Sequence, residues 1–150
     1  MKAFRLERTG EIVNPVKHTI DVLGEHRDCK IYVGTDSQNK RRCTLYATVI
    51  AYRYGTRGVH YIFHREKVGK IRDKYTRLWK EVEMSLEVSD LLRNNSISVH
   101  SIDLDFNKEK TAGSNFIVSS AAGYCVGMGY SVNLKPDSQI ATRAADHLVR

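Results

Sequence analysis

The chain has 150 residues, enough for one domain with a sizeable core. It is 41% hydrophobic and 27% charged, which excludes a disordered chain, and no apolar run approaches the roughly 20 residues of a membrane-spanning helix. The formal net charge of +7 favours an anionic partner such as nucleic acid.

The first half of the chain predicts a three-stranded antiparallel meander. Residues 1–27 are mixed and polar, with a weakly helical piece at 16–23, and are interpreted as an N-terminal extension. Segments 29–35 and 42–54 are rich in β-branched and aromatic residues, and the polar segment 37–40 joins them as a hairpin. Residues 59–65 continue as a third strand.

The second half alternates helices with strands. Apolar residues at helical spacing predict a helix over 72–92, and a strand should follow at 97–103. A helix at 114–128, a strand at 131–134 and a helix from 138 to the chain end complete the pattern. The order β-β-β-α-β-α-β-α indicates an α/β domain over 28–150, built on one mixed five-stranded sheet flanked by helices.

Two carboxylates fall where these strands are expected to end. Asp36 ends the first predicted strand and Asp103 ends the fourth. If these strands are neighbours, the carboxylates converge, and each repels the other unless a cation neutralises them. No histidine or cysteine cluster accompanies them, so hard oxygen ligands favour Mg²⁺ or Mn²⁺ over zinc. Such ions support phosphodiester hydrolysis.

Four segments carry a resemblance to a known family: "IYVGTDSQ" at 31–38, "EVEMSLEVSDLL" at 81–92, "HSIDLD" at 100–105 and "GYSVNLKPDSQIATRAADHL" at 129–148. In this order they resemble the YkuK-like family of the ribonuclease H-like superfamily, from about residue 29 to the C-terminus. The resemblance implies a ribonuclease H-like fold and metal-dependent nuclease chemistry. It also implies metal-binding, catalytic acids at Asp36, at a glutamate of the first long helix, at Asp103 and at Asp146.

Several of these acids have alternatives. On the helix at 72–92, Glu81 and Glu83 both flank the apolar face, and Glu81 is preferred because the small Ser85 lies one turn further on. Asp103 and Asp105 share a strand face, and Asp103 is preferred because it lies within the apolar run. The resemblance selects Asp146 on the last helix, although Asp137 is an alternative ligand or an N-cap.

A basic stretch precedes the acid-bearing helix. Residues 64–80 contain seven Lys or Arg against two acids, with Tyr75 and Trp79 among them. Such a stretch can hold phosphates and stack a base. The candidates for nucleic-acid binding are Lys70, Arg72, Lys74 and Arg77.

Two functions remain open at this point. One is a nuclease that cleaves RNA, DNA or a hybrid with Mg²⁺ or Mn²⁺ held by Asp36, Glu81, Asp103 and Asp146. The other is a ribonuclease H-like module that binds nucleic acid or protein without cleavage. The three cysteines are widely spaced and form no C-x-x-C pair, which favours reduced thiols and a cytoplasmic location.

Overall fold

The computed structural model describes residues 2–55, 59–107, 115–135 and 137–150. Its strands are β1 (Phe4–Leu6), β2 (Ile12–Val13), β3 (Lys30–Asn39), β4 (Cys43–Arg53), β5 (Val59–Gly69), β6 (Ser101–Asn107) and β7 (Val132–Lys135). Its helices are α1 (Pro15–Glu25), α2 (Lys74–Asn94), α3 (Asn115–Gly127) and α4 (Ala141–Val149). None of the helices in these ranges is both long and apolar enough to cross a bilayer.

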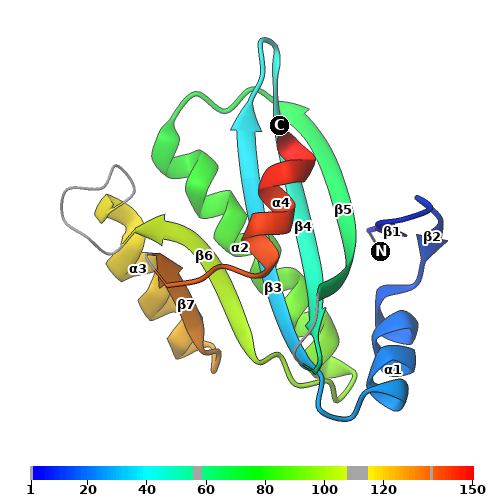
Figure 1. The fold of residues 1–150 in the computed structure, drawn as a ribbon. Coiled ribbons are helices and arrows are strands. Elements are labelled where there is room, and N and C mark those ends of the chain that lie inside the picture. The colour runs from blue at the N-terminus through cyan, green and yellow to red at the C-terminus, as the bar shows by residue number, and fades with distance from the viewer. Residues whose placement is uncertain (1, 56–58, 108–114, 136) are drawn as a thin grey trace.

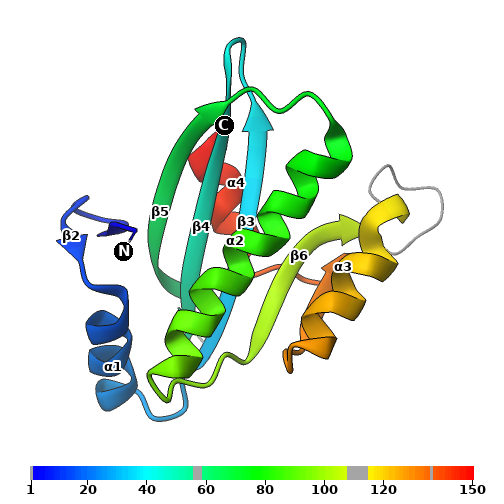
Figure 2. The same cartoon turned by 180° about the vertical axis from the view of Figure 1, so that it is seen from behind.

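One mixed sheet organises the described residues, in the order β2-β1-β5-β4-β3-β6-β7. β3, β4 and β5 pair antiparallel, whereas β6 lies parallel to β3 and β7 lies parallel to β6. Helix α4 covers one face of the sheet, and α2 and α3 cover the other (Figures 1 and 2). The predicted α/β class and the predicted order of eight elements, β3 to α4, are confirmed.

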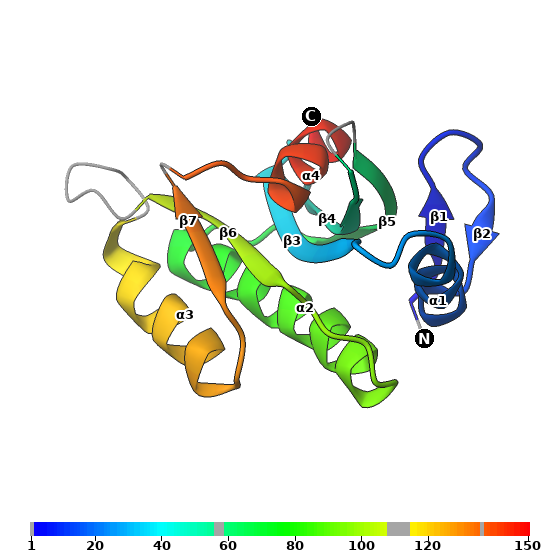
Figure 3. The ribbon, with the colours of Figure 1, turned by 60° about the horizontal axis from the view of Figure 1, so that its bottom comes forward.

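The predicted number of five strands is wrong, because the described sheet has seven. The two additional strands come from the N-terminal extension, where β1 pairs with β2 and hydrogen-bonds to β5. Figure 3 shows this hairpin and α1 lying together beyond β5, at the edge of the sheet opposite β7. The predicted helical piece at 16–23 is confirmed as α1, whose N-terminal amides donate to the side chain of Asn14.

Several strand boundaries differ from those predicted. β5 extends to Gly69 instead of residue 65. β3 continues through the polar Ser37, Gln38 and Asn39, so Asp36 lies inside the strand, opposite Ala47 of β4. The strand predicted at 97–103 instead spans Ser101–Asn107, because Leu104 and Phe106 continue its buried face. Residue 114, where the third helix was expected to start, lies outside the described residues.

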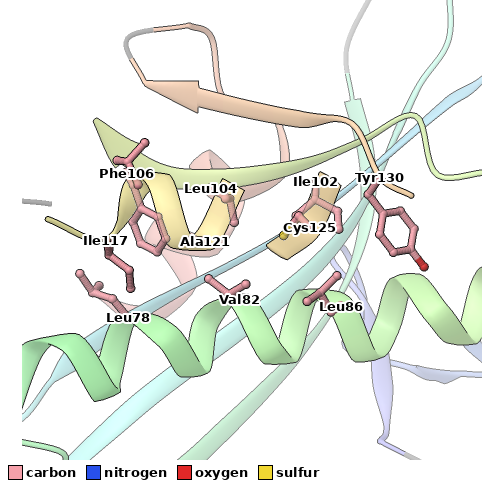
Figure 4. Close-up of a cluster of buried hydrophobic side chains, with 11 residues drawn as sticks. Leu78, Val82, Leu86, Ile102, Leu104, Phe106, Ile117, Ala121, Cys125 and Tyr130 are labelled. Carbon is pink, nitrogen blue, oxygen red and sulfur yellow. The ribbon is translucent and has the colours of Figure 1, made fainter. Parts of the chain in front are cut away.

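A hydrophobic core between α2, α3 and β6 fixes where α2 lies on the sheet. Leu78, Val82 and Leu86 form one stripe of α2 at helical spacing (Figure 4). Opposite them are the alternate residues of β6 and the inner face of α3: Ile102, Leu104, Phe106, Ile117, Ala121 and Cys125. Each fully buried large apolar side chain here contributes about 1.5–3 kcal/mol. The position of α2 is therefore set by packing rather than by its polar residues.

Candidate active site

Strand β3 presents one face to α4 and the other to α2. Gly34 faces α4 so closely that a Cβ on it would lie 2.8 Å from Thr142 Cγ2 and 3.0 Å from Ala141 Cβ. Thr35 faces α2, where its hydroxyl hydrogen-bonds to that of Ser85 at 2.8 Å. Since side chains alternate along a strand, Asp36 lies on the α4 face and Ser37 on the α2 face.

The register of β3 and β6 brings Asp105 to Asp36. Tyr32, Val33 and Gly34 pair with Ser101, Ile102 and Asp103 in parallel. Continuing this register by two residues on both strands places Asp105 beside Asp36 on the α4 face. The charge of Asp105 accordingly raises the pKa of Asp36.

The structure gives Asp103 a different environment from the one expected. Its carboxylate accepts the N–H groups of Ile140 at 2.7 Å and Ala141 at 2.6 Å, at the start of α4, and the Asn133 side-chain amide at 3.2 Å. Burial raises the pKa of Asp103, and these donors oppose the rise. Asp103 therefore anchors the N-terminus of α4, and it is Asp105, the alternative left open, that lies with Asp36.

Glu81 reaches the same end of β3 from the opposite face of the sheet. It is only 3% exposed, and one of its carboxylate oxygens accepts a hydrogen bond from the Ser37 hydroxyl. The Arg77 guanidinium donates to the Ser37 hydroxyl at 2.7 Å and lies 4.0 Å from the Glu81 carboxylate. Burial, followed by the charge of Asp36, raises the pKa of Glu81 well above its usual value. Glu83, the alternative, is exposed.

Asp146 completes the group from α4. Ala141, Ala145 and Val149 of this helix are buried on the sheet, and Asp146 stands beside Ala145 at the edge of that face. Its side chain is 42% exposed and accepts a hydrogen bond from Arg150 at 2.6 Å. An open cleft of about 640 Å³ lies here and is lined by Asp105, Lys135, Asp137, Ser138, Gln139, Thr142, Arg143, Asp146, His147 and Arg150.

Burial and two neighbouring carboxylates, Asp105 and Asp146, raise the pKa of Asp36. Burial is the largest cause that raises the pKa of Asp36 to about 7. The charge of Asp105 follows, and Asp146 adds both its charge and a hydrogen bond. Three of the acids expected from the sequence, Asp36, Glu81 and Asp146, are thus brought together, and the fourth member of the group is Asp105.

All four acids of this group are carboxylates, the hard oxygen ligands that Mg²⁺ and Mn²⁺ prefer. Among the described residues, however, no three His, Cys, Asp or Glu side chains stand in an arrangement ready to coordinate an ion. Basic side chains contact the carboxylates instead: Lys135 Nζ lies 2.5 Å from Asp105 Oδ1. Sequence reasoning missed Lys135, although it is the last residue of β7 and directly follows a predicted strand.

The predicted nucleic-acid-binding residues occupy two environments. Arg77 belongs to the acid group through Ser37 and Glu81. Lys70 and Arg72 lie in the connection from β5 to α2, and Lys74 begins α2. Asn39 binds the Ile71 carbonyl oxygen at 3.1 Å, so this connection lies beside the tip of the β3–β4 hairpin. The basic connection and the acids are therefore at the same end of β3.

Comparisons with known proteins give one finding. The model of the family described as Ribonuclease H-like matches residues 11–150. The match begins within the N-terminal extension, so it includes α1 and β2. Searches of curated proteins and of solved structures found no match.

Proposed function

Because the chain belongs to the ribonuclease H-like family, we propose that it is a metal-dependent nuclease that cleaves phosphodiester bonds in RNA, DNA or a hybrid. The family indicates a nuclease-like or nucleic-acid-binding role. The observation that supports the enzyme is the convergence of Asp36, Glu81, Asp105 and Asp146 from β3, α2, β6 and α4. Beyond burial, Asp105 and Asp146 raise the pKa of Asp36, and Asp36 and Asp105 raise that of Glu81, so this group of acids favours a divalent cation as its counter-charge.

The chemistry of these donors suits Mg²⁺ or Mn²⁺, since all four are hard oxygen ligands. The buried Asp36 and Glu81 have raised pKa values, so their ionised forms favour a cation beside them. A bound divalent ion would supply Lewis-acid stabilisation of the charge that develops on the scissile phosphate and would acidify a water. Asp36, Glu81, Asp105 and Asp146 would hold it, and Asp105 takes the place that the sequence assigned to Asp103.

Other residues of the chain orient this site. Ser37 and Arg77 fix one carboxylate oxygen of Glu81. Asp103 fixes the start of α4, the helix on which Asp146 lies five residues after Ala141. Lys70, Arg72 and Lys74 supply positive charge at the same end of β3, where they would contact the nucleic-acid backbone. His147 lines the cleft next to Asp146.

Finer assignments also belong to this proposal. The four segments quoted above support membership of the YkuK-like family. Cys29, Cys43 and Cys125 are free thiols, which supports a cytoplasmic location. The division into an extension at 1–27 and a domain at 28–150 stays a prediction, although β1 of the extension is hydrogen-bonded to β5 of the domain.

A second candidate function is a module that binds nucleic acid without cleaving it. The observation that favours it is the ion pairing of the acids, since Lys135, Arg150 and Arg77 each contact one of them. A protein that kept these pairs permanently would have no use for a metal. The two candidates therefore differ in whether a divalent cation binds.

Calorimetric titration with Mn²⁺ separates the candidates. The nuclease predicts saturable Mn²⁺ binding and metal-dependent cleavage of labelled RNA, DNA or hybrid oligonucleotides. Asp36→Asn and Asp105→Asn should each weaken Mn²⁺ binding at least tenfold and abolish cleavage. Oligonucleotide binding without any Mn²⁺ binding would instead establish the non-catalytic module.

Asp103→Asn is the matched control for Asp105→Asn. It retains one oxygen that accepts the N–H groups of α4, so the protein should fold, with a loss of stability of about 1–2 kcal/mol. Its Mn²⁺ affinity should stay within about threefold of the original protein. A larger loss of affinity in Asp103→Asn than in Asp105→Asn would restore Asp103 as the ligand.

A further inference from the structure

Three of the four grouped carboxylates have a basic partner. Lys135 Nζ lies 2.5 Å from Asp105 Oδ1, and Arg150 lies 2.6 Å from the Asp146 carboxylate. Arg77 lies 4.0 Å from Glu81. Asp36 has no ion pair with any described residue, so up to four negative charges face three positive ones.

Lys135 is the most central of these cations. Its Nζ pairs with Asp105, and the Asp36 and Asp146 carboxylates also act on it through their charges. It is the last residue of β7, which pairs with β6. The pairing of β7 with β6 therefore places Lys135 where the carboxylates converge.

The three basic side chains differ in their exposure and in the number of groups that hold them. The Arg77 side chain is only 19% exposed and is also bound to the Ser37 hydroxyl and carbonyl oxygen. The side chains of Lys135 and Arg150 are 47% and 65% exposed, and each has one acid as its ion-pair partner among the described residues. Lys135 and Arg150 can leave the acids by rotation about their own bonds, whereas Arg77 cannot.

A carboxylate oxygen that holds a divalent ion at about 2.0–2.6 Å cannot keep an ammonium group at 2.5 Å in the same direction. A bound ion would therefore displace the basic side chain toward the adjoining cleft, which Lys135, Arg143 and Arg150 line. A released cation in a cleft beside a phosphodiester site is placed to bind phosphate.

We propose that Lys135 and Arg150 are exchangeable counter-ions, which pair with Asp105 and Asp146 in the metal-free protein and transfer to substrate phosphates when the metal binds. The inference rests on the proposed function. It assigns the cleft between β7 and α4 as a phosphate-binding surface and makes nucleic-acid binding there dependent on the metal. It also makes these two basic residues competitors of the metal.

The first test is calorimetric titration of Mn²⁺ into the original protein, Lys135→Met, Arg150→Met and the control Arg143→Met at one pH and salt concentration. Arg143 lines the same cleft but forms no ion pair with a described residue. Removing a competing cation should tighten Mn²⁺ binding about three- to tenfold for Lys135→Met and somewhat less for Arg150→Met. Arg143→Met should leave the affinity unchanged.

The second test measures binding of a labelled single-stranded oligonucleotide with Ca²⁺ or with EDTA. Ca²⁺ should tighten binding by the original protein, and the Lys135→Met, Arg150→Met double variant should lose most of that increase. The dependence of log affinity on log salt should also fall by about 1.5 in the double variant, since two phosphate contacts are lost.

The outcomes separate this inference from the proposed function. If the original protein binds no Mn²⁺, the proposed metal site itself fails. If it binds Mn²⁺ but Lys135→Met and Arg150→Met bind it equally or more weakly, the exchange is refuted and the metal site stands. Circular dichroism of each variant checks the fold, and Lys135→Gln serves as a second, more polar replacement.

Discussion

At the scale of single residues, burial of Asp36 lowers the stability of the metal-free protein when its carboxyl group is ionised. Asp36 is 9% exposed, and its burial is the largest cause that raises the pKa of the carboxyl group to about 7, against 3.8 in an open chain. An acid whose pKa rises on folding binds its proton more tightly in the folded state. Its contribution to stability is therefore complete below about pH 4 and is lost as the pH rises to about 7.

Asp36→Asn should therefore stabilise the metal-free protein while it weakens Mn²⁺ binding at least tenfold. We expect a gain of about 2 kcal/mol at pH 8 and a smaller gain at pH 5, measured by urea unfolding in EDTA. The exposed Glu83→Gln serves as the control and should change stability by less than about 0.5 kcal/mol. A loss of stability in Asp36→Asn at pH 8 would show that the carboxylate is stabilised in the fold.

The sequence can point to a site residue when the pattern that marks it lies within one segment of the chain. The structure brings Asp36, Glu81 and Asp146 together, and the sequence pointed to each of them because its carboxylate interrupts an apolar pattern or matches a motif. Asp105 could not be separated from Asp103 by alternation, since both lie on one strand face. The choice depended on the register with β3 and on the start of α4, which are contacts between segments far apart in the chain.

At the scale of elements, the close packing of α4 on β3 positions Asp146. Gly34 allows this approach because it lacks a Cβ. The order of strands and helices was predictable, since the apolar period changes from two to 3.6 along the chain. The end of β3 was not, because the polar residues that suggested a turn are satisfied by Glu81, Arg77 and Thr44.

Gly34→Ala should displace α4 and weaken metal binding together. The added Cβ would lie 2.8 Å from Thr142 Cγ2 and 3.0 Å from the Thr142 backbone nitrogen, so the helix must shift. We expect a loss of stability of about 1–3 kcal/mol and a several-fold loss of Mn²⁺ affinity. Adding Thr142→Ser, which removes Cγ2, should restore part of both.

Gly24→Ala provides the control for this substitution. Gly24 lies in the last turn of α1, and a Cβ there would meet no atom within 4 Å. Alanine has the higher helix propensity, so Gly24→Ala should leave stability equal or higher by up to about 1 kcal/mol, with unchanged Mn²⁺ affinity. Equal effects of the two substitutions would exclude a specific role for the contact between Gly34 and α4.

At the scale of the whole molecule, two histidines join the N-terminal extension to the sheet. His18 of α1 and His60 of β5 face each other with 2.8 Å between their Nε2 atoms, so one proton serves both rings. Burial lowers the pKa of each, and His18 lowers that of His60 further. The charged groups that act on the pair are Glu7, Arg8, Asp21 and Glu25.

The attachment of α1 and β1 should weaken in acid. A histidine whose pKa falls on folding contributes its full stability above the unfolded value of about 6.5 and loses it as the pH falls. Hydrogen exchange, corrected for its intrinsic pH dependence, should show less protection of α1 and β1 at pH 5.5 than at pH 7.5. His60→Gln should remove most of this difference, and equal protection at both pH values would contradict the prediction.

The order of strands also bears on solubility. β1 pairs with Phe63 and Ile62 in the middle of the 11-residue β5, and the outermost strands, β2 and β7, have two and four residues. A long, unpaired strand at the edge of a sheet offers backbone groups on which another chain can add a strand. The N-terminal hairpin occupies part of that edge. It should therefore reduce aggregation through this edge, a role independent of the carboxylates on β3 and β6.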